Sequence, residues 1–161
     1  GDVLAKEGIE FEVCQPGAKV HPCMACYHCL NNNTLRCIQA DDGVNEIIEK
    51  CIAADAIVLA SPVYHGGIAG SMKCVMDRIM LAACCGENQF HHKVGAALCT
   101  LRRSGGMETY QQLLGLMDAM EMVLSLRITG TPCMERTSVS ASRILRVWKS
   151  LKSSAAISHG C

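Results

Sequence analysis

Residues 56–78 read AIVLASPVYHGGIAGSMKCVMDR, and this stretch decides the fold. Its first five residues, 56–60, form a continuous apolar run, which is typical of a strand buried on both faces. Small residues interrupt the run at 61–67, and apolar side chains then recur at helical spacing over 68–84. A buried strand that passes through a glycine-containing loop into a helix predicts one unit of a parallel α/β sheet.

The same alternation continues on both sides of this stretch. Period-two alternation predicts an earlier strand at 9–13, and apolar runs predict later strands at 94–98 and 122–126. A further helix is expected at 106–120. Because parallel strands are joined by helical crossovers, we expect a three-layer α/β fold with ligands at the carboxyl ends of the strands.

One more helix is expected at 44–54, where apolar residues fall on a single stripe. Asp41 and Asp42 stand directly before it. Carboxylates in that place accept hydrogen bonds from free backbone amides and meet the positive end of the helix dipole. We therefore expect these two residues to cap the helix.

Composition restricts the function classes. The chain has 161 residues, half of them apolar, and a formal net charge of zero, which gives no support to nucleic-acid binding. No uncharged apolar run is long enough to span a membrane. The first twelve residues carry charges throughout, so we expect no secretory leader. Twelve cysteines in such a chain indicate a reducing, cytoplasmic compartment.

Four cysteines, Cys23, Cys26, Cys29 and Cys37, follow the pattern C-x2-C-x2-C-x7-C. Thiolates two residues apart can reach one metal from a single tight turn, and a fourth thiolate can complete the ligand set from a nearby loop. Three interpretations fit this spacing: a 4Fe–4S cluster, a zinc ion, or four reduced thiols near a subunit contact.

The stretch from Pro22 to Met80, PCMACYHCLNNNTLRCIQADDGVNEIIEKCIAADAIVLASPVYHGGIAGSMKCVMDRIM, resembles the flavodoxin-like NADPH-dependent FMN reductases. It is closest to the branch that includes the iron–sulfur flavoproteins, in which the four cysteines match the cluster-binding pattern. A later segment, KVGAALCTLRRSGGMETYQQL at 93–113, resembles the family's next strand and its RR-x-G loop. The resemblance covers roughly residues 5–126 and implies a flavodoxin-like fold that binds FMN.

The resemblance also implies that two loops border the flavin. Glycines in the first loop let the backbone approach a flat ring closely, although an ordinary strand-to-helix connection is the alternative. The second loop lines the other edge of the flavin or binds NADPH phosphates through its arginines, unless it is only a solvated basic turn. The two loops comprise Ser61, Pro62, Val63, Tyr64, His65, Gly66 and Gly67, and Arg102, Arg103, Ser104 and Gly105. No catalytic side chain is assigned, since the cofactor carries the chemistry.

Two departures from the family limit what this chain carries. The family begins with a strand, a Gly-Ser-rich loop that holds the FMN phosphate, and a helix, whereas 1–8 matches only the tail of that helix. We therefore expect that the sequence is truncated at its amino terminus, so that the first strand and the phosphate loop of the family are missing. The sheet should then show a gap or distortion between the strands at 9–13 and 56–60.

The second departure is the tail. Residues 1–126 carry 14 acidic and 9 basic side chains, whereas 127–161 carry one acid and six bases. Residues 128–135 stand where the family has Tyr-Trp-Asn-x-x-His-Gly, and possible codons for them, read in another frame, spell that motif. This favours a frameshift near Arg127, with a divergent basic tail and a helix at 139–151 as the alternative. We divide the chain into an incomplete FMN-binding domain, 1–126, and a tail, 127–161.

The function implied by the resemblance is that of an FMN-dependent oxidoreductase. It would pass electrons from NAD(P)H to flavin, quinone or another small-molecule acceptor. A non-enzymatic iron–sulfur/flavin protein that takes electrons from ferredoxin is the alternative. A third possibility is that the fragment, without its phosphate loop, is inactive. We expect a homo-oligomer, either a dimer or a tetramer, with neither nucleic acid nor membrane as a partner.

Overall fold

The computed structural model describes residues 2–39, 42–84 and 86–125. Its elements are α1 (Asp2–Lys6), α2 (His28–Asn32), α3 (Val44–Ala53), β1 (Ala56–Tyr64), β2 (Gly67–Ile68), α4 (Gly70–Ala83), β3 (Val94–Thr100), α5 (Gly106–Ala119) and β4 (Val123–Leu124). Asp41, the tail at 127–161 and the helix expected at 139–151 lie outside the described residues.

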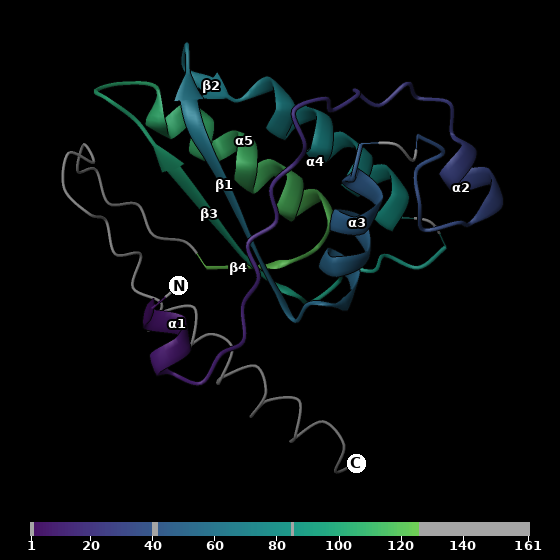
Figure 1. The fold of residues 1–161 in the computed structure, drawn as a ribbon, viewed down its shortest axis with the longest axis horizontal. Coiled ribbons are helices and arrows are strands. Elements are labelled where there is room, and N and C mark those ends of the chain that lie inside the picture. The colour runs from purple at the N-terminus through teal and green to yellow at the C-terminus, as the bar shows by residue number, and fades with distance from the viewer. Residues whose placement is uncertain (1, 40–41, 85, 126–161) are drawn as a thin grey trace.

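The sheet has the order β2-β1-β3-β4. Strands β1 and β3 run parallel, in register from the pair Ala56 and Val94 to the pair Pro62 and Thr100, and β3 runs parallel to β4. The carboxyl ends of β1 and β3 therefore lie side by side at the same end of the sheet, which is called its carboxyl edge below (Figure 1). This arrangement confirms the parallel strands predicted at 56–60 and 94–98, and it confirms the one predicted at 122–126 over Val123–Leu124.

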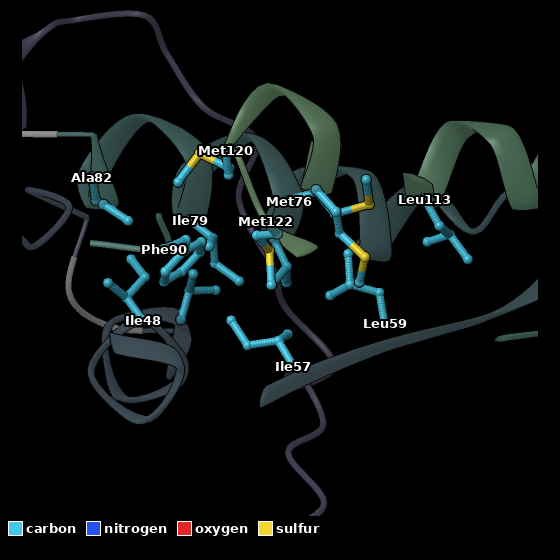
Figure 2. Packing of buried hydrophobic residues seen from close by; sticks show 14 of the residues in the cluster. Ile48, Ile57, Leu59, Met76, Ile79, Ala82, Phe90, Leu113, Met120 and Met122 are labelled. Atoms are coloured by element: carbon cyan, nitrogen blue, oxygen red, sulfur yellow. The ribbon is translucent and has the colours of Figure 1, made fainter. Parts of the chain in front are cut away.

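The core lies between β1 and a layer of three helices, α3, α4 and α5. Burial alternates along β1, so that Ile57 and Leu59 are buried while Val58 between them is 43% exposed. The prediction that 56–60 is buried on both faces is therefore wrong, because the helices cover the Ile57 face of this strand and leave Val58 accessible. Figure 2 shows Ile57 and Leu59 pointing toward side chains of α4, among them Met76 and Ile79. The helices predicted over 44–54, 68–84 and 106–120 are confirmed, with α4 beginning two residues later than expected.

The strand predicted at 9–13 is wrong. The backbone over these residues forms no strand, and Phe11 and Val13 are exposed. Ile9 instead donates its N–H to the carbonyl of Leu4, which closes the end of α1. A strand exists only through hydrogen bonds to a neighbour, and the described sheet has none for this segment. Period-two alternation reports the spacing of side chains but carries no information about a pairing partner.

The helices give no candidate for a membrane span. Within the part of the chain that the structure describes, none is long and apolar enough to cross a bilayer.

Candidate functional site at the carboxyl edge of the sheet

The first predicted flavin loop, 61–67, is mostly a β-hairpin rather than a loop. Strand β1 continues to Tyr64, and β2 pairs with it through the partners Tyr64 and Gly67. The two residues between them, His65 and Gly66, have φ values of 48° and 79°. A two-residue type I′ turn requires positive φ at both central residues, and glycine at the second of them adopts it without a steric penalty. The prediction of a loop at these positions is therefore corrected to a strand end, a tight turn and a short return strand.

Ser61 serves the hairpin itself. Its side chain is buried, its hydroxyl oxygen accepts the N–H of Ala69 at 3.0 Å, and its O–H donates to the carbonyl of Pro62 at 2.9 Å. These bonds fix the point where β2 passes into α4. By contrast, Tyr64 is 62% exposed and Pro62 is also exposed, so both are accessible at the surface.

The second predicted loop ends in direct contact with this hairpin. Gly105 has φ of 81°, and a Cβ placed on it would lie 2.7 Å from Cα of Gly66 and 3.0 Å from Cγ1 of Val63. The backbones of the two turns therefore pack against each other, although the two glycines are 39 positions apart in the sequence. Arg102 and Arg103 are exposed beside this contact, as is Ser104, which precedes Gly105.

Helix α5 holds both turns in place through polar side chains that sequence reasoning missed. The Gln112 Oε1 accepts the N–H of Ile68 in β2 at 3.1 Å. The hydroxyl of Thr109, which is fully buried, donates to the carbonyl of Gly105 at 2.8 Å. Polar residues in the first turns of a helix are common, so the sequence held no signal that singled out these two.

The space next to the hairpin turn is open on one side. A Cβ placed on Gly66 would meet no atom within 4 Å, so the ligand side of this turn is open while its other side rests on Gly105. A closely approachable backbone at the carboxyl end of a parallel sheet is where α/β folds of this type bind cofactors. The residues present therefore fit the flavin that the sequence predicted. Their individual contacts with it stay predictions.

The four predicted metal-ligating cysteines lie in and beside α2, remote in sequence from the hairpin. Cys29 is buried, Cys23 and Cys37 are half-buried, and Cys26 is exposed. The thiol of Cys23 accepts the N–H of Ala25 at 3.5 Å, and the chain turns at Ala25 and Tyr27 through φ values of 50° and 55°.

These thiols have the donor chemistry of an iron–sulfur site but not its geometry. Four soft thiol ligands in one segment suit iron–sulfur clusters. Among the described residues, however, no three His, Cys, Asp or Glu side chains are placed so that they could hold a metal ion. The described arrangement therefore does not fit a formed cluster, and the ligand assignment stays a prediction.

Sequence reasoning also missed a buried ion pair beneath the cysteines. The guanidinium of Arg78 on α4 donates to Asp42, and both side chains are at most 1% exposed. Burial raises the pKa of Asp42, but hydrogen bonds from Arg78, His21 and Val44 outweigh burial and hold it below its usual value. The expected cap is only partly present: Asp42 accepts the N–H of Val44 at 3.3 Å, while Gly43 occupies the N-cap position.

The chain resembles known proteins in sequence. Residues 1–129 match a family model described as NADPH-dependent FMN reductase. An iron–sulfur flavoprotein of Methanocaldococcus jannaschii is 38% identical over 110 residues, which are 67% of this chain and 54% of that protein. An iron–sulfur flavoprotein of Archaeoglobus fulgidus is 30% identical over 137 residues, or 81% of this chain and 66% of that protein. The chain spans about half the length of the first curated relatives it matches.

A solved structure shares the fold. The crystal structure of RosB with bound 8-demethyl-8-formylriboflavin-5'-phosphate superposes with a TM-score of 0.60 over 89% of this chain and 64% of that one. At 18% identity this likeness supports the flavodoxin-like fold and nothing further.

Proposed function

Because the chain belongs to the NADPH-dependent FMN reductase family, we propose that it is a flavoprotein oxidoreductase that passes electrons from NAD(P)H to flavin, quinone or another small acceptor. FMN, when bound, supplies the hydride and electron chemistry. The protein's own residues then bind the ring, orient it and leave one side open to the donor and the acceptor.

The observation that carries this proposal is the contact between the two turns. Gly66 and Gly105 bring the predicted flavin loops together at the carboxyl edge of the sheet, with open space on the outer side of Gly66. In the proposed complex the ring lies against the His65–Gly66 turn. The exposed side chain of Tyr64 covers the ring, and Arg102 or Arg103 pairs with phosphates of the nicotinamide donor.

Flavin titrations test the proposal. FMN and riboflavin share the ring but differ in the phosphate, so their affinities separate ring contacts from phosphate contacts. For the 161-residue chain we expect the fluorescence of both flavins to be quenched on binding, with affinities within about threefold, since the proposed contacts with the His65–Gly66 turn are made by the shared ring. A tenfold preference for FMN would place phosphate contacts worth about 1.4 kcal/mol within this chain. Absence of saturable binding, here and in the longest reading frame that contains the chain, would contradict the proposal.

Two substitutions at Gly66 make the titration specific to the turn. Gly66→Val adds a β-branched side chain at a φ of 79° and fills the space proposed for the ring, so flavin affinity should fall at least tenfold. Gly66→Asn tolerates the same φ, keeps the hairpin and fills less of that space, so its loss should be smaller. Equal affinity of the valine variant and the wild type, with unchanged circular dichroism, would show that the turn is only a connection.

A second candidate function is iron–sulfur electron transfer with ferredoxin as the donor. It is favoured by the four thiols at 23–37 and by the similarity to proteins named iron–sulfur flavoproteins. Anaerobic purification should then yield iron and acid-labile sulfide together with a broad absorbance beyond the flavin bands. Cys26→Ser should remove them. Iron at background level in anaerobic wild-type protein would leave the interpretation as reduced thiols.

The proposed setting is a cytoplasmic homo-oligomer. Large apolar side chains are exposed around the cysteines, among them Met24, Tyr27 and Ile38, and such a group favours a subunit contact. The cytoplasmic setting is proposed from the cysteine content of the sequence, since thiols persist in a reducing compartment. Sedimentation of the chain measures the oligomeric state directly.

A further inference from the structure

Arg78 is a buried cation with partners far away in the sequence. Its side chain has no exposed surface. One terminal nitrogen, Nη1, donates to Asp42 and reaches the carbonyl of His21 at 3.4 Å, while Nη2 donates to the carbonyl of Gln39 at 2.6 Å. Its Nε has no hydrogen-bond partner among the residues that the structure describes. Because a buried charge is costly unless it is paired, this guanidinium and its partners must form as one unit.

Asp42 forms the other half of that unit. Its Oδ2 accepts both the Arg78 guanidinium and the N–H of His21, the latter at 3.1 Å. The N–H of Val44, the first residue of α3, reaches Oδ1 at 3.3 Å. One carboxylate thus joins α4, the start of α3 and the chain just before the first cysteine of the motif.

The chain after the last cysteine of the motif is held at the same place. Asn45 brackets Cys37: its Oδ1 accepts the Cys37 N–H at 2.7 Å, and its Nδ2 donates to the Cys37 carbonyl at 2.9 Å. The thiol of Cys37 is reached by Nε2 of Gln39 at 3.9 Å. Gln39 closes the circle, since its Nε2 donates to the carbonyl of Pro22 at 3.0 Å.

Residues 22–39 therefore form a loop, called here the thiol loop, whose two ends meet at a buried polar base. The base consists of Arg78, Asp42, Asn45 and Gln39. Most of the rest of the loop is exposed, Cys26 included, whereas Cys29 of α2 is buried. Helix α4 begins after β2 and runs toward α2 (Figure 1). Arg78, which closes the base, therefore lies on the helix that follows the His65–Gly66 turn.

We propose that Arg78 is the positioning residue of the thiol loop. Its guanidinium closes the base and keeps Cys37 beside the segment that carries Cys23, Cys26 and Cys29. The proposal rests on the proposed role of these thiols as ligands. It also accounts for thiols that have the donor chemistry of an iron–sulfur site but not its geometry. The base of the loop is formed, while the described thiols are not close enough together to hold a metal ion.

Hydrogen–deuterium exchange of the 161-residue chain tests the closure without any metal or flavin. The variant is Arg78→Met with Asp42→Leu, which removes both charges so that neither is left buried and unpaired. Amides in 20–39 should exchange at least tenfold faster, while those of β3 stay protected. Arg78→Lys, which keeps the charge but not the planar fork, should give an intermediate rate. Arg36→Met, which removes the exposed pair with Glu49, is the control and should change little.

Cobalt(II) alone serves as the second probe, since its thiolate charge-transfer absorbance reports ligation by cysteine. Under anaerobic conditions we expect the double variant to bind Co²⁺ at least tenfold more weakly than the wild type, and the Arg36→Met control to bind it equally. If the wild type shows no such absorbance, the proposed metal role of the thiols fails, and exchange alone decides the role of Arg78. Unchanged exchange in 20–39, or equally accelerated exchange in β3, would overturn the proposal, the latter because Arg78 would then support the whole fold.

Discussion

Gly105 is the residue on which the contact between the two turns depends. It has a φ of 81°, and it has no room for a side chain, because Cα of Gly66 lies 2.7 Å from the position of a Cβ. The loop that contains Gly66 was predicted from its small residues, and the loop that ends at Gly105 was implied by the family resemblance. Their mutual contact could not be predicted, because it depends on how β1 and β3 pair and on the bond from Thr109 to Gly105.

Gly105→Ala should therefore destabilise the chain by about 1–3 kcal/mol, through a left-handed backbone and a clash that separates the turns. Gly115→Ala is a matched control. Position 115 lies in α5 with no atom within 4 Å of an added Cβ, so alanine there should stabilise by about 0.5–1 kcal/mol. Urea unfolding followed by circular dichroism measures both. Equal effects of the two substitutions would contradict the close packing of the turns.

At the scale of elements, α3 shows how much of a helix can be predicted from its own sequence. Its apolar stripe predicted the helix and its buried face, and both are confirmed by Val44 and Ile48. Its first turn is met by Asp42, as the local sequence predicted, but this carboxylate also pairs with Arg78. Its last carbonyls are reached by Lys93, which directly precedes β3. No local pattern marks Arg78 or Lys93 as a partner of this region, because they become neighbours only after the chain has folded.

Removal of the lysine at the end of α3 should cost more than its surface position suggests. The ammonium of Lys93 donates to the carbonyls of Cys51, Ile52 and Ala54, which α3 itself leaves without amide partners. We expect Lys93→Met to destabilise by about 1–2 kcal/mol. The control is Lys73→Met, which removes an exposed pair with Asp77 on α4 and should change stability by less than about 0.5 kcal/mol. Comparable losses in the two variants would exclude a capping role for Lys93.

Asp42→Asn should lower stability at neutral pH by about 3–5 kcal/mol, because the Arg78 charge would be left buried without its partner. The pH dependence has a definite sign. The pKa of Asp42 is lower in the folded chain than in the unfolded chain, so its contribution is complete above the unfolded pKa of about 3.9. That contribution is lost as pH falls through the folded pKa. The difference in free energy of unfolding between wild type and variant, measured with urea from pH 7 to pH 3, should therefore become smaller toward low pH. A constant difference would show that Asp42 is not charged in the folded state.

For the whole molecule, the sequence predicted those features that arise from continuous apolar runs. The strands at 56–60 and 94–98 were predictable because a continuous apolar run favours a strand wherever it pairs, although the burial of 56–60 on both faces was not. The strand at 9–13 failed because its pattern needed a neighbour, and none is present in the described sheet. The pair between Arg78 and Asp42 escaped prediction for a related reason: a charged residue within a helical pattern is normally solvated, and only the packing of α4 under the thiol loop buries this one.

The last prediction concerns how closely the two faces of the sheet are covered. Adjacent residues of β1 lie on opposite faces, so substitutions at them compare the two faces. Ile57 points into the core between the helices (Figure 2), whereas Val58 is 43% exposed on the opposite face. Both residues are β-branched, so replacing either by alanine loses a similar strand preference. Only Ile57→Ala also opens a cavity in the core, and it should cost about 2–5 kcal/mol. Val58→Ala should cost less than about 1 kcal/mol, because little buried surface is lost. If the two variants unfold at the same urea concentration in this chain, the face that carries Val58 is as closely covered as the core, and the one-sided packing of β1 against α3, α4 and α5 is wrong.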